Sequence, residues 1–326
     1  MVPLLVLLLV LQGTVEAAAQ GGESGAPANE GALFLLLPVG AQGVATGRAM
    51  TATPTQEAAF WNPAGLARID RSRFLMYRGE TLAGEATAVS LLLNPTSLGA
   101  FGLSYQLLDV GTQDLTDSEG MTLGSISVRS HLGILSFAAP IRTRLNAGVN
   151  FKLVQFRVSC RGQCVDPGIV ASTYAVDLGL QAMPVQRIPL RVGAMVAHLG
   201  PKLQVVNAEQ ADPLPTRLRL SAAYDVLRHF FPDEDFELWT TMELEDRWRE
   251  PGSPSAYFGT EFSSGTRDVV FVRAGYVLGR IDQPDGAAVG IGLRYERLEI
   301  AVAKSLARPG LSGEGEPVHV TLGVLF

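Results

Sequence analysis

Residues 145–153 read Leu-Asn-Ala-Gly-Val-Asn-Phe-Lys-Leu, a stretch in which every second side chain is apolar. Side chains of a β-strand point alternately to its two faces, so this period of two predicts a strand with one apolar face. The same alternation is clear in residues 100–107, 174–182, 218–226, 236–245 and 289–295. Because it continues from residue 72 to residue 326, the sequence predicts an all-β fold.

The second face of these strands consists mainly of small residues, namely Gly, Ala, Ser and Asn with isolated charges. A strand face in contact with bulk water carries more Lys, Glu and Thr than this. The chain has 35 Gly among its 326 residues, and 18% of its residues are charged, against ~25% in a typical soluble domain. We therefore expect the apolar faces to meet lipid and the small faces to line a closed barrel, because lipid tolerates β-structure only when every backbone group is paired.

About fourteen strands are predicted, an even number as in bacterial outer-membrane barrels. The connections after even-numbered strands are mostly short, as in residues 140–143, whereas those after odd-numbered strands are mostly long, as in residues 108–127 and 157–171. This parity is expected of periplasmic turns and extracellular loops, and it predicts a transmembrane antiparallel barrel over residues 72–326. The strands are expected at 72–79, 85–93, 99–107, 128–139, 144–156, 172–183, 189–198, 216–226, 236–246, 255–263, 268–278, 286–295, 297–305 and 317–326.

Both ends of the chain are consistent with export. The apolar run Leu4–Leu11 and the small residues Ala17–Ala19 predict a signal peptide at residues 1–19, followed by a flexible lead-in at 20–30. A buried strand or a short anchor is the alternative, since eight apolar residues fall short of the ~20 that a spanning helix needs. The last strand ends at Phe326, and a terminal aromatic residue resembles the signal read by the barrel assembly machinery. We expect that machinery and outer-membrane lipid as partners.

Cys160 and Cys164 are the only cysteines, and the turn residues Asp166-Pro167-Gly168 follow them. Their spacing is not a common zinc spacing, and one pair cannot complete a tetrahedral site. We expect a disulfide within a loop, with free thiols as the alternative.

A barrel of this size is too wide for its own side chains to fill. Residues 31–71 precede the first expected strand and are apolar without strand alternation. Within them, Asn62-Pro63-Ala64-Gly65 predicts a turn, because the residue before a proline is pushed out of the helical region. The sequence therefore predicts an N-terminal hatch folded into the barrel.

Several motifs resemble the PorV/PorQ family of outer-membrane proteins, which is itself similar to the long-chain fatty-acid transporter (FadL-type) barrels. The resemblance implies an integral outer-membrane protein without enzymatic activity, serving transport or protein secretion as an accessory component. The motifs are Leu36–Ala41, Gly47–Ala49, Trp61–Leu66, Gly259–Phe262, Val272–Tyr276 and Gly290–Tyr295.

Two other functions stay open. One is a FadL-like passive channel for long-chain fatty acids or other hydrophobic small molecules. The other, which has less support, is a lipid-modifying enzyme of the outer membrane. A transporter is expected to have an apolar pocket between hatch and wall and a lateral opening, whereas a secretion scaffold is expected to have a sealed lumen and apolar loops. A hydrophobic small molecule and secretion-system proteins are the respective partners.

Five charged residues are expected to point into the lumen from successive strands. We interpret them first as a structural ion-pair network that fills the lumen, since opposite charges on neighbouring strands pair. The second interpretation is a gate or carboxylate site for an acidic lipid head group at Arg273 or Arg294. The five residues are Glu243, Glu245, Glu261, Arg273 and Arg294.

Other chemistry has little support in the sequence. The four histidines are scattered, no two of them sit at a metal-ligand spacing, and no G-x-S-x-G nucleophile motif occurs, so we expect no catalytic residues, metal or cofactor. Lys and Arg number 26 against 32 Asp and Glu, which gives a net charge of −6. Without a basic run, this balance excludes nucleic acid as a partner.

Overall fold

The computed structural model describes residues 30–81, 83–94, 99–164, 168–205, 207, 209–231, 234–279, 285–306 and 317–326. The expected signal peptide and nearly all of the lead-in at 20–30 lie outside these residues. In the described part of the chain, every helix is too short or too polar to cross a membrane.

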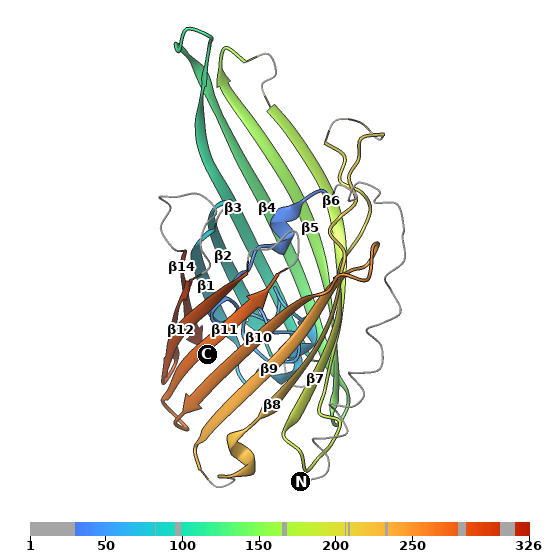
Figure 1. Ribbon diagram of the computed structural model, residues 1–326, viewed down its shortest axis with the longest axis vertical. Coiled ribbons are helices and arrows are strands. Elements are labelled where there is room, and N and C mark those ends of the chain that lie inside the picture. The colour runs from blue at the N-terminus through green and yellow to red at the C-terminus, as the bar shows by residue number, and fades with distance from the viewer. Residues whose placement is uncertain are drawn as a thin grey trace.

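The strands form one closed barrel in which each strand pairs antiparallel with its neighbours in sequence (Figure 1). Closure comes from β1 and β14, which pair from Arg73 opposite Leu325 to Gly79 opposite His319. This closed barrel confirms the all-β, antiparallel part of the prediction, with about fourteen strands. The strands are β1 Arg73–Thr81, β2 Gly84–Leu93, β3 Ala100–Thr116, β4 Thr122–Arg142, β5 Leu145–Gly162, β6 Gly168–Ala182, β7 Leu190–Leu199, β8 Arg217–Asp225, β9 Phe236–Arg247, β10 Ser255–Ser264, β11 Val269–Leu278, β12 Gly286–Tyr295, β13 Leu298–Ser305 and β14 Val318–Leu325.

Burial alternates along the strands as the sequence pattern predicts. In β1, Leu75 and Tyr77 are buried inside the barrel, whereas Phe74 and Met76 are exposed outside it. The exposed face is apolar around the whole circumference, because most strands place large aliphatic or aromatic residues there. Examples are Leu103, Leu135, Leu153, Leu178, Leu220, Met242, Val272, Ile291, Ile300 and Leu322.

The two ends of the barrel differ. We call the end that carries the connections after β1, β3, β5, β7, β9, β11 and β13 the loop end, and the opposite end the turn end. At the loop end, the β3–β4 and β5–β6 hairpins rise beyond the rest of the wall (Figure 1). The predicted loops at 108–127 and 157–171 are therefore wrong, because most of their residues extend these four strands.

The strand extensions escape the sequence pattern for a physical reason. A register shift between Asp109 and Thr112 changes the phase of alternation in β3. Beyond it, the outward positions carry polar side chains such as Ser127, Arg157 and Ser159 instead of apolar ones. A search for apolar outward residues therefore ends these strands too early.

Residues 30–72, which we call the N-terminal segment, run through the barrel from the loop end to the turn end. The segment begins beside the β7–β8 connection, where the N–H of Gly31 donates to the carbonyl of Pro213 at 2.9 Å. It then contacts β11–β14 through α2 (Ala41–Ala45) and β3–β6 through η2 (Pro63–Arg68) before entering β1. A short 3-10 helix, η1 (Leu33–Leu36), lies in its first part, and another, η3 (Leu227–His229), lies in the β8–β9 connection.

Candidate functional site in the lumen

Inward-facing glycines let the backbone of the N-terminal segment lie directly on the wall. A Cβ added to Gly275 would collide with backbone atoms of Gly47 and Thr46, and one added to Gly193 would collide with Thr51. Gly148 faces the backbone of Pro63 in the same way. Gly179, Gly259 and Gly290 add further close contacts. The N-terminal segment therefore packs against these inward-facing glycines, which we call the glycine seat: Gly148, Gly179, Gly193, Gly259, Gly275 and Gly290.

The Asn62–Gly65 turn packs against the glycine seat at Gly148 and Gly179. The side chain of Asn62 accepts the N–H of Ala64 at 3.1 Å, which caps η2, and Pro63 follows in the first position of that helix. The Asn62 amide also donates to the carbonyls of Thr51, at 2.7 Å, and of Leu180 on β6, at 3.2 Å. Asn62 thus joins two parts of the segment to the wall.

Two of the five charged residues lie on β9 and are almost completely buried. Glu243 accepts hydrogen bonds from the N–H of Thr51 at 2.7 Å and from its hydroxyl at 2.8 Å. Glu245 lies 2.6 Å from the guanidinium of Arg219 and accepts the hydroxyl of Tyr257 at 3.2 Å. Glu243 therefore holds the N-terminal segment, whereas Glu245 pairs with a neighbouring strand.

The other three charged residues take part in two separate ion pairs, the second of which includes Glu299. Arg273 on β11 donates to Glu261 on β10 at 2.6 Å, and Gln42 of the N-terminal segment donates to the same carboxylate at 2.8 Å. Arg294 lies 3.0 Å from Glu299 on β13 instead of reaching Glu261. The structure thus places all five charged residues at the lumen, but in distinct clusters.

The sequence reasoning missed the partners Arg219, Glu299 and Thr51. Arg219 and Glu299 sit at alternate, inward positions of predicted strands, so their position was a usable signal. Thr51 carried no such signal, because it lies in the irregular N-terminal segment.

A further buried cluster was also missed and lies on β5, β6 and β7. Asp177 is completely buried and lies 2.6 Å from the ammonium of Lys152. It also accepts hydrogen bonds from Asn150 at 2.8 Å and from the backbone N–H of His198 at 2.9 Å. The Asn150 amide also donates a hydrogen bond to the carbonyl of Ala59, so this cluster joins the wall to the N-terminal segment.

Toward the loop end, the inner surface of β1–β6 is apolar instead. Phe34, Leu35 and Val39 of the N-terminal segment pack there against inward side chains of the wall and of the β7–β8 connection. The wall residues are Tyr77, Ala86, Ala88, Leu108, Leu132, Ile134, Val154, Ala171 and Ala175, and the connection supplies Leu203 and Leu214.

This apolar surface continues up the inner face of the protruding hairpins. Phe156 packs at the rim of the lumen cluster. Beyond it, Val128, Val158 and Ile169 lie side by side on β4, β5 and β6, all half-buried. Ile126 extends the surface toward the tip. We call Ile126, Val128, Val158, Ile169 and Phe156, together with the lumen cluster, the apolar track.

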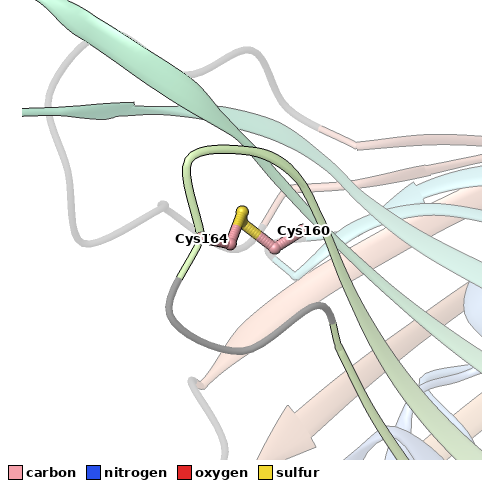
Figure 2. Close-up of a disulfide and its surroundings, with 2 residues drawn as sticks. All are labelled: Cys160 and Cys164. Atoms are coloured by element: carbon pink, nitrogen blue, oxygen red, sulfur yellow. A yellow bond between two sulfur atoms is a disulfide. The ribbon is translucent and has the colours of Figure 1, made fainter.

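The disulfide lies at the tip of the same surface. Cys160 on β5 is joined to Cys164 in the connection to β6 (Figure 2). Cys160 lies opposite Ile126 of β4, so the bond closes the β5–β6 turn beside the end of the apolar track.

Two hollows accompany these features. A cavity of about 390 Å³ lies between the N-terminal segment and the wall at the turn end, and its lining is polar, including Gln42, Arg191 and Glu261. The guanidinium of Arg191 lies 3.5 Å from the ring centre of Trp239 in this cavity. An apolar groove of about 550 Å³ lies on the outside of the wall, among residues such as Leu180, Leu220 and Met242. The cavity against the N-terminal segment is thus not the apolar pocket expected of a transporter.

No known protein family and no curated protein matches this chain. Solved structures share its fold. The CymD monoaromatic hydrocarbon channel aligns with a TM-score of 0.59 at 13% identity, covering 89% of this chain and 97% of that one. The toluene transporter TbuX of Ralstonia pickettii aligns with a TM-score of 0.55 at 12% sequence identity, and the alignment covers 88% of this chain and 96% of that one. A FadL homologue of Pseudomonas aeruginosa aligns with a TM-score of 0.53 at 11% sequence identity, and the alignment covers 89% of this chain and 98% of that one.

At these identities the likeness establishes the fold alone. The closed antiparallel barrel resembles the folds of these three proteins, of which CymD is a monoaromatic hydrocarbon channel and TbuX is a toluene transporter. The PorV/PorQ relationship that the sequence motifs suggest finds no support in the comparisons.

Proposed function

We propose that the protein is an outer-membrane barrel that lets hydrophobic small molecules pass without energy input. The observation that carries this proposal is the apolar track. It leads from the inner face of the protruding hairpins, past Phe156, to the apolar inner surface of β1–β6. An apolar solute lowers its free energy at each step along such a surface, since contact with water is removed.

The outer surface supports a membrane location. Its outward residues are apolar on nearly every strand, and a closed barrel leaves no unpaired sheet edge in lipid. The signal peptide at 1–19 and the assembly signal at Phe326 belong to this proposal as the means of reaching the outer membrane.

We assign residues 31–71 the role of a hatch. Their backbone rests on glycines of the wall, and Glu243, Asn150 and Asn62 hold them by hydrogen bonds. Phe34, Leu35 and Val39 instead pack by apolar contacts against the inner surface of β1–β6. This division supports a polar, hydrogen-bonded base and an apolar layer on the β1–β6 side of the lumen.

The lumen charges support structure better than ligand binding. Arg273 and Arg294 each have a carboxylate within hydrogen-bonding distance, so neither guanidinium is free for an acidic head group. Because the neighbours by fold are hydrocarbon channels, we also prefer the conduit to a secretion accessory or a lipid-modifying enzyme.

The proposal is tested by uptake into cells that carry the protein in their outer membrane. Toluene and a labelled long-chain fatty acid serve as probes, and cells without the protein give the baseline. Val128→Asp places a charge in the apolar track and should lower uptake several-fold, since an unpaired charge on an apolar path is unfavourable. Ser127→Asp, at the next residue and on the opposite face, is the matched control and should leave uptake unchanged.

Both variants lie in the protruding hairpin, outside the packed lumen, and should assemble normally. Heat-modifiable migration on gels measures the amount of folded barrel in each membrane. Equal uptake by the two variants, or uptake by the wild type no higher than the baseline, would contradict the conduit.

A further inference from the structure

The outward face of the long strands changes character at one level. Tyr105, Leu153 and Tyr174 occupy one cross-strand row on β3, β5 and β6, and aromatic residues of this kind are typical of a membrane–water interface. In the next outward row toward the loop end, β4 and β5 carry His131 and Gln155. Leu107 on β3 lies in that row, and Val170 on β6 lies in the row beyond it. Beyond the tyrosine row the outward surface is therefore polar on β4 and β5, while β3 and β6 still carry apolar residues.

One row further, Arg129 on β4 lies directly opposite Arg157 on β5. Residues paired in this way have Cα atoms about 4.5–5.5 Å apart, and like charges opposite each other destabilise a sheet. Asp109 on β3 lies in the same row and is 2.9 Å from Arg129. No carboxylate of the described residues lies within 4.0 Å of the Arg157 guanidinium.

The surroundings leave a positive charge at β5. Two rows nearer the tip, Arg161 on β5 and Asp114 on β3 lie in one row with a serine between them. The row in between carries the hydroxyls of Ser127 and Ser159. Both carboxylates are thus on β3, whereas β6 contributes no charged side chain to these rows. We call Arg129, Arg157 and Arg161 the arginine patch.

We propose that the arginine patch binds the phosphate groups of a phosphorylated glycolipid in the outer leaflet. The proposal rests on the outer-membrane location proposed above, because it needs this end of the barrel to face that leaflet. The arginine row lies four residues beyond the tyrosine row, about 13 Å of strand. Long arginine side chains can bend back toward head groups at the interface. A phosphate between two guanidiniums accepts paired hydrogen bonds from both and removes their repulsion.

The test uses the full-length protein in detergent micelles. Binding of a diphosphorylated lipid A and of the same lipid without phosphates is measured by native mass spectrometry, with inorganic phosphate as a competitor. Arg157→Gln should weaken binding of the diphosphorylated lipid about tenfold, as expected for one lost charge-assisted contact. The matched control is Arg78→Gln on β1, an exposed arginine that already pairs with Glu85, and it should bind as the wild type does.

A second readout separates binding from a structural role. Without lipid, Arg157→Gln should raise the melting temperature, since it removes the repulsion with Arg129. With lipid, the wild type should gain stability and the variant should gain less. A purely structural arginine would shift both temperatures alike.

Three results would overturn the proposal: equal binding of both lipids, wild-type binding by Arg157→Gln, or displacement of the lipid by millimolar inorganic phosphate. The uptake assay separates this proposal from the proposed conduit function. Arg157→Gln should transport as the wild type does. A wild type that binds the glycolipid but transports nothing contradicts the conduit alone, whereas one that transports without binding contradicts the arginine patch alone.

Discussion

The carboxylate of Asp177 accepts the backbone N–H of His198 at 2.9 Å, at the register shift of the β6–β7 ladder. His198 has φ of 60°, in the left-handed region, which marks a β-bulge where one N–H leaves the ladder. The same carboxylate binds Lys152 and Asn150 of β5. One buried group on β6 therefore holds the end of β7 on one side and β5 on the other.

Removing this carboxylate should strongly destabilise the barrel. Asp177→Leu leaves the buried ammonium of Lys152 without a carboxylate, with Nδ1 of His198 at 3.2 Å as its remaining contact, and breaking a buried ion pair in this way costs about 3–5 kcal/mol. Urea unfolding in micelles measures the loss. In the double variant Asp177→Leu/Lys152→Met the uncompensated charge is gone, so its loss should be smaller than that of Asp177→Leu alone. A double variant less stable than the single one would contradict the role given to the pair.

The glycine seat makes a sharper steric prediction. Gly275→Ala pushes a methyl group against backbone atoms of Gly47 and Thr46, which cannot rotate away as a side chain could. We expect a loss of about 1–3 kcal/mol, typical of overpacking, and a lower temperature of heat-modifiable migration. Gly133→Ala is the matched control, because its Cβ would face outward, 4.0 Å from the nearest atom, on Leu153. Equal effects of the two substitutions would argue against a tightly seated segment.

The disulfide should matter locally and little for the whole barrel. It closes a turn with a sequence separation of only 4 residues at the tip of a hairpin, and short loops gain the least from closure. Cys160→Ser should therefore leave global unfolding nearly unchanged but speed proteolysis between β5 and β6. The β3–β4 hairpin, cleaved in the same digest, provides the internal control. Global unfolding at clearly lower urea would show that the bond acts beyond its hairpin.

Alternation predicted most of this fold because the wall of this closed barrel has an apolar outer face and an inner face of small or polar residues. The expected strand at 236–246 compares with Phe236–Arg247, and that at 286–295 with Gly286–Tyr295. Both strands keep mostly apolar residues such as Met242 and Ile291 outward, so periodicity and environment agree. In the protruding hairpins, as at Val128 and Arg129, the polarity of the two faces is exchanged and the rule fails.

The candidate site was less predictable for a related reason. Inward charges such as Glu243 and Arg273 stand out on a small-residue face, and the structure places both in the lumen. Their partners depend on tertiary contacts: Glu243 meets Thr51, which is 192 residues away in sequence. The sequence alone does not reveal the apolar track, because the expected strand ends at Phe156 and Val158 lies in the expected loop at 157–171.

Arg273→Met distinguishes the structural role of a lumen charge from a role in transport. The Glu261 carboxylate would lose its cationic partner at 2.6 Å, with Gln42 as its remaining contact. Because both side chains are largely buried, stability should fall by about 3–5 kcal/mol. Arg267→Met is the matched control, since its side chain is 77% exposed and pairs with Glu296 in a turn-end connection. Exposed pairs of this kind contribute little, so we expect wild-type unfolding for this control. Uptake per folded barrel should stay at the wild-type level in both variants, because Arg273 acts on packing and not on the solute. Loss of fatty-acid uptake in Arg273→Met, with toluene uptake retained, would instead assign this guanidinium to an acidic head group.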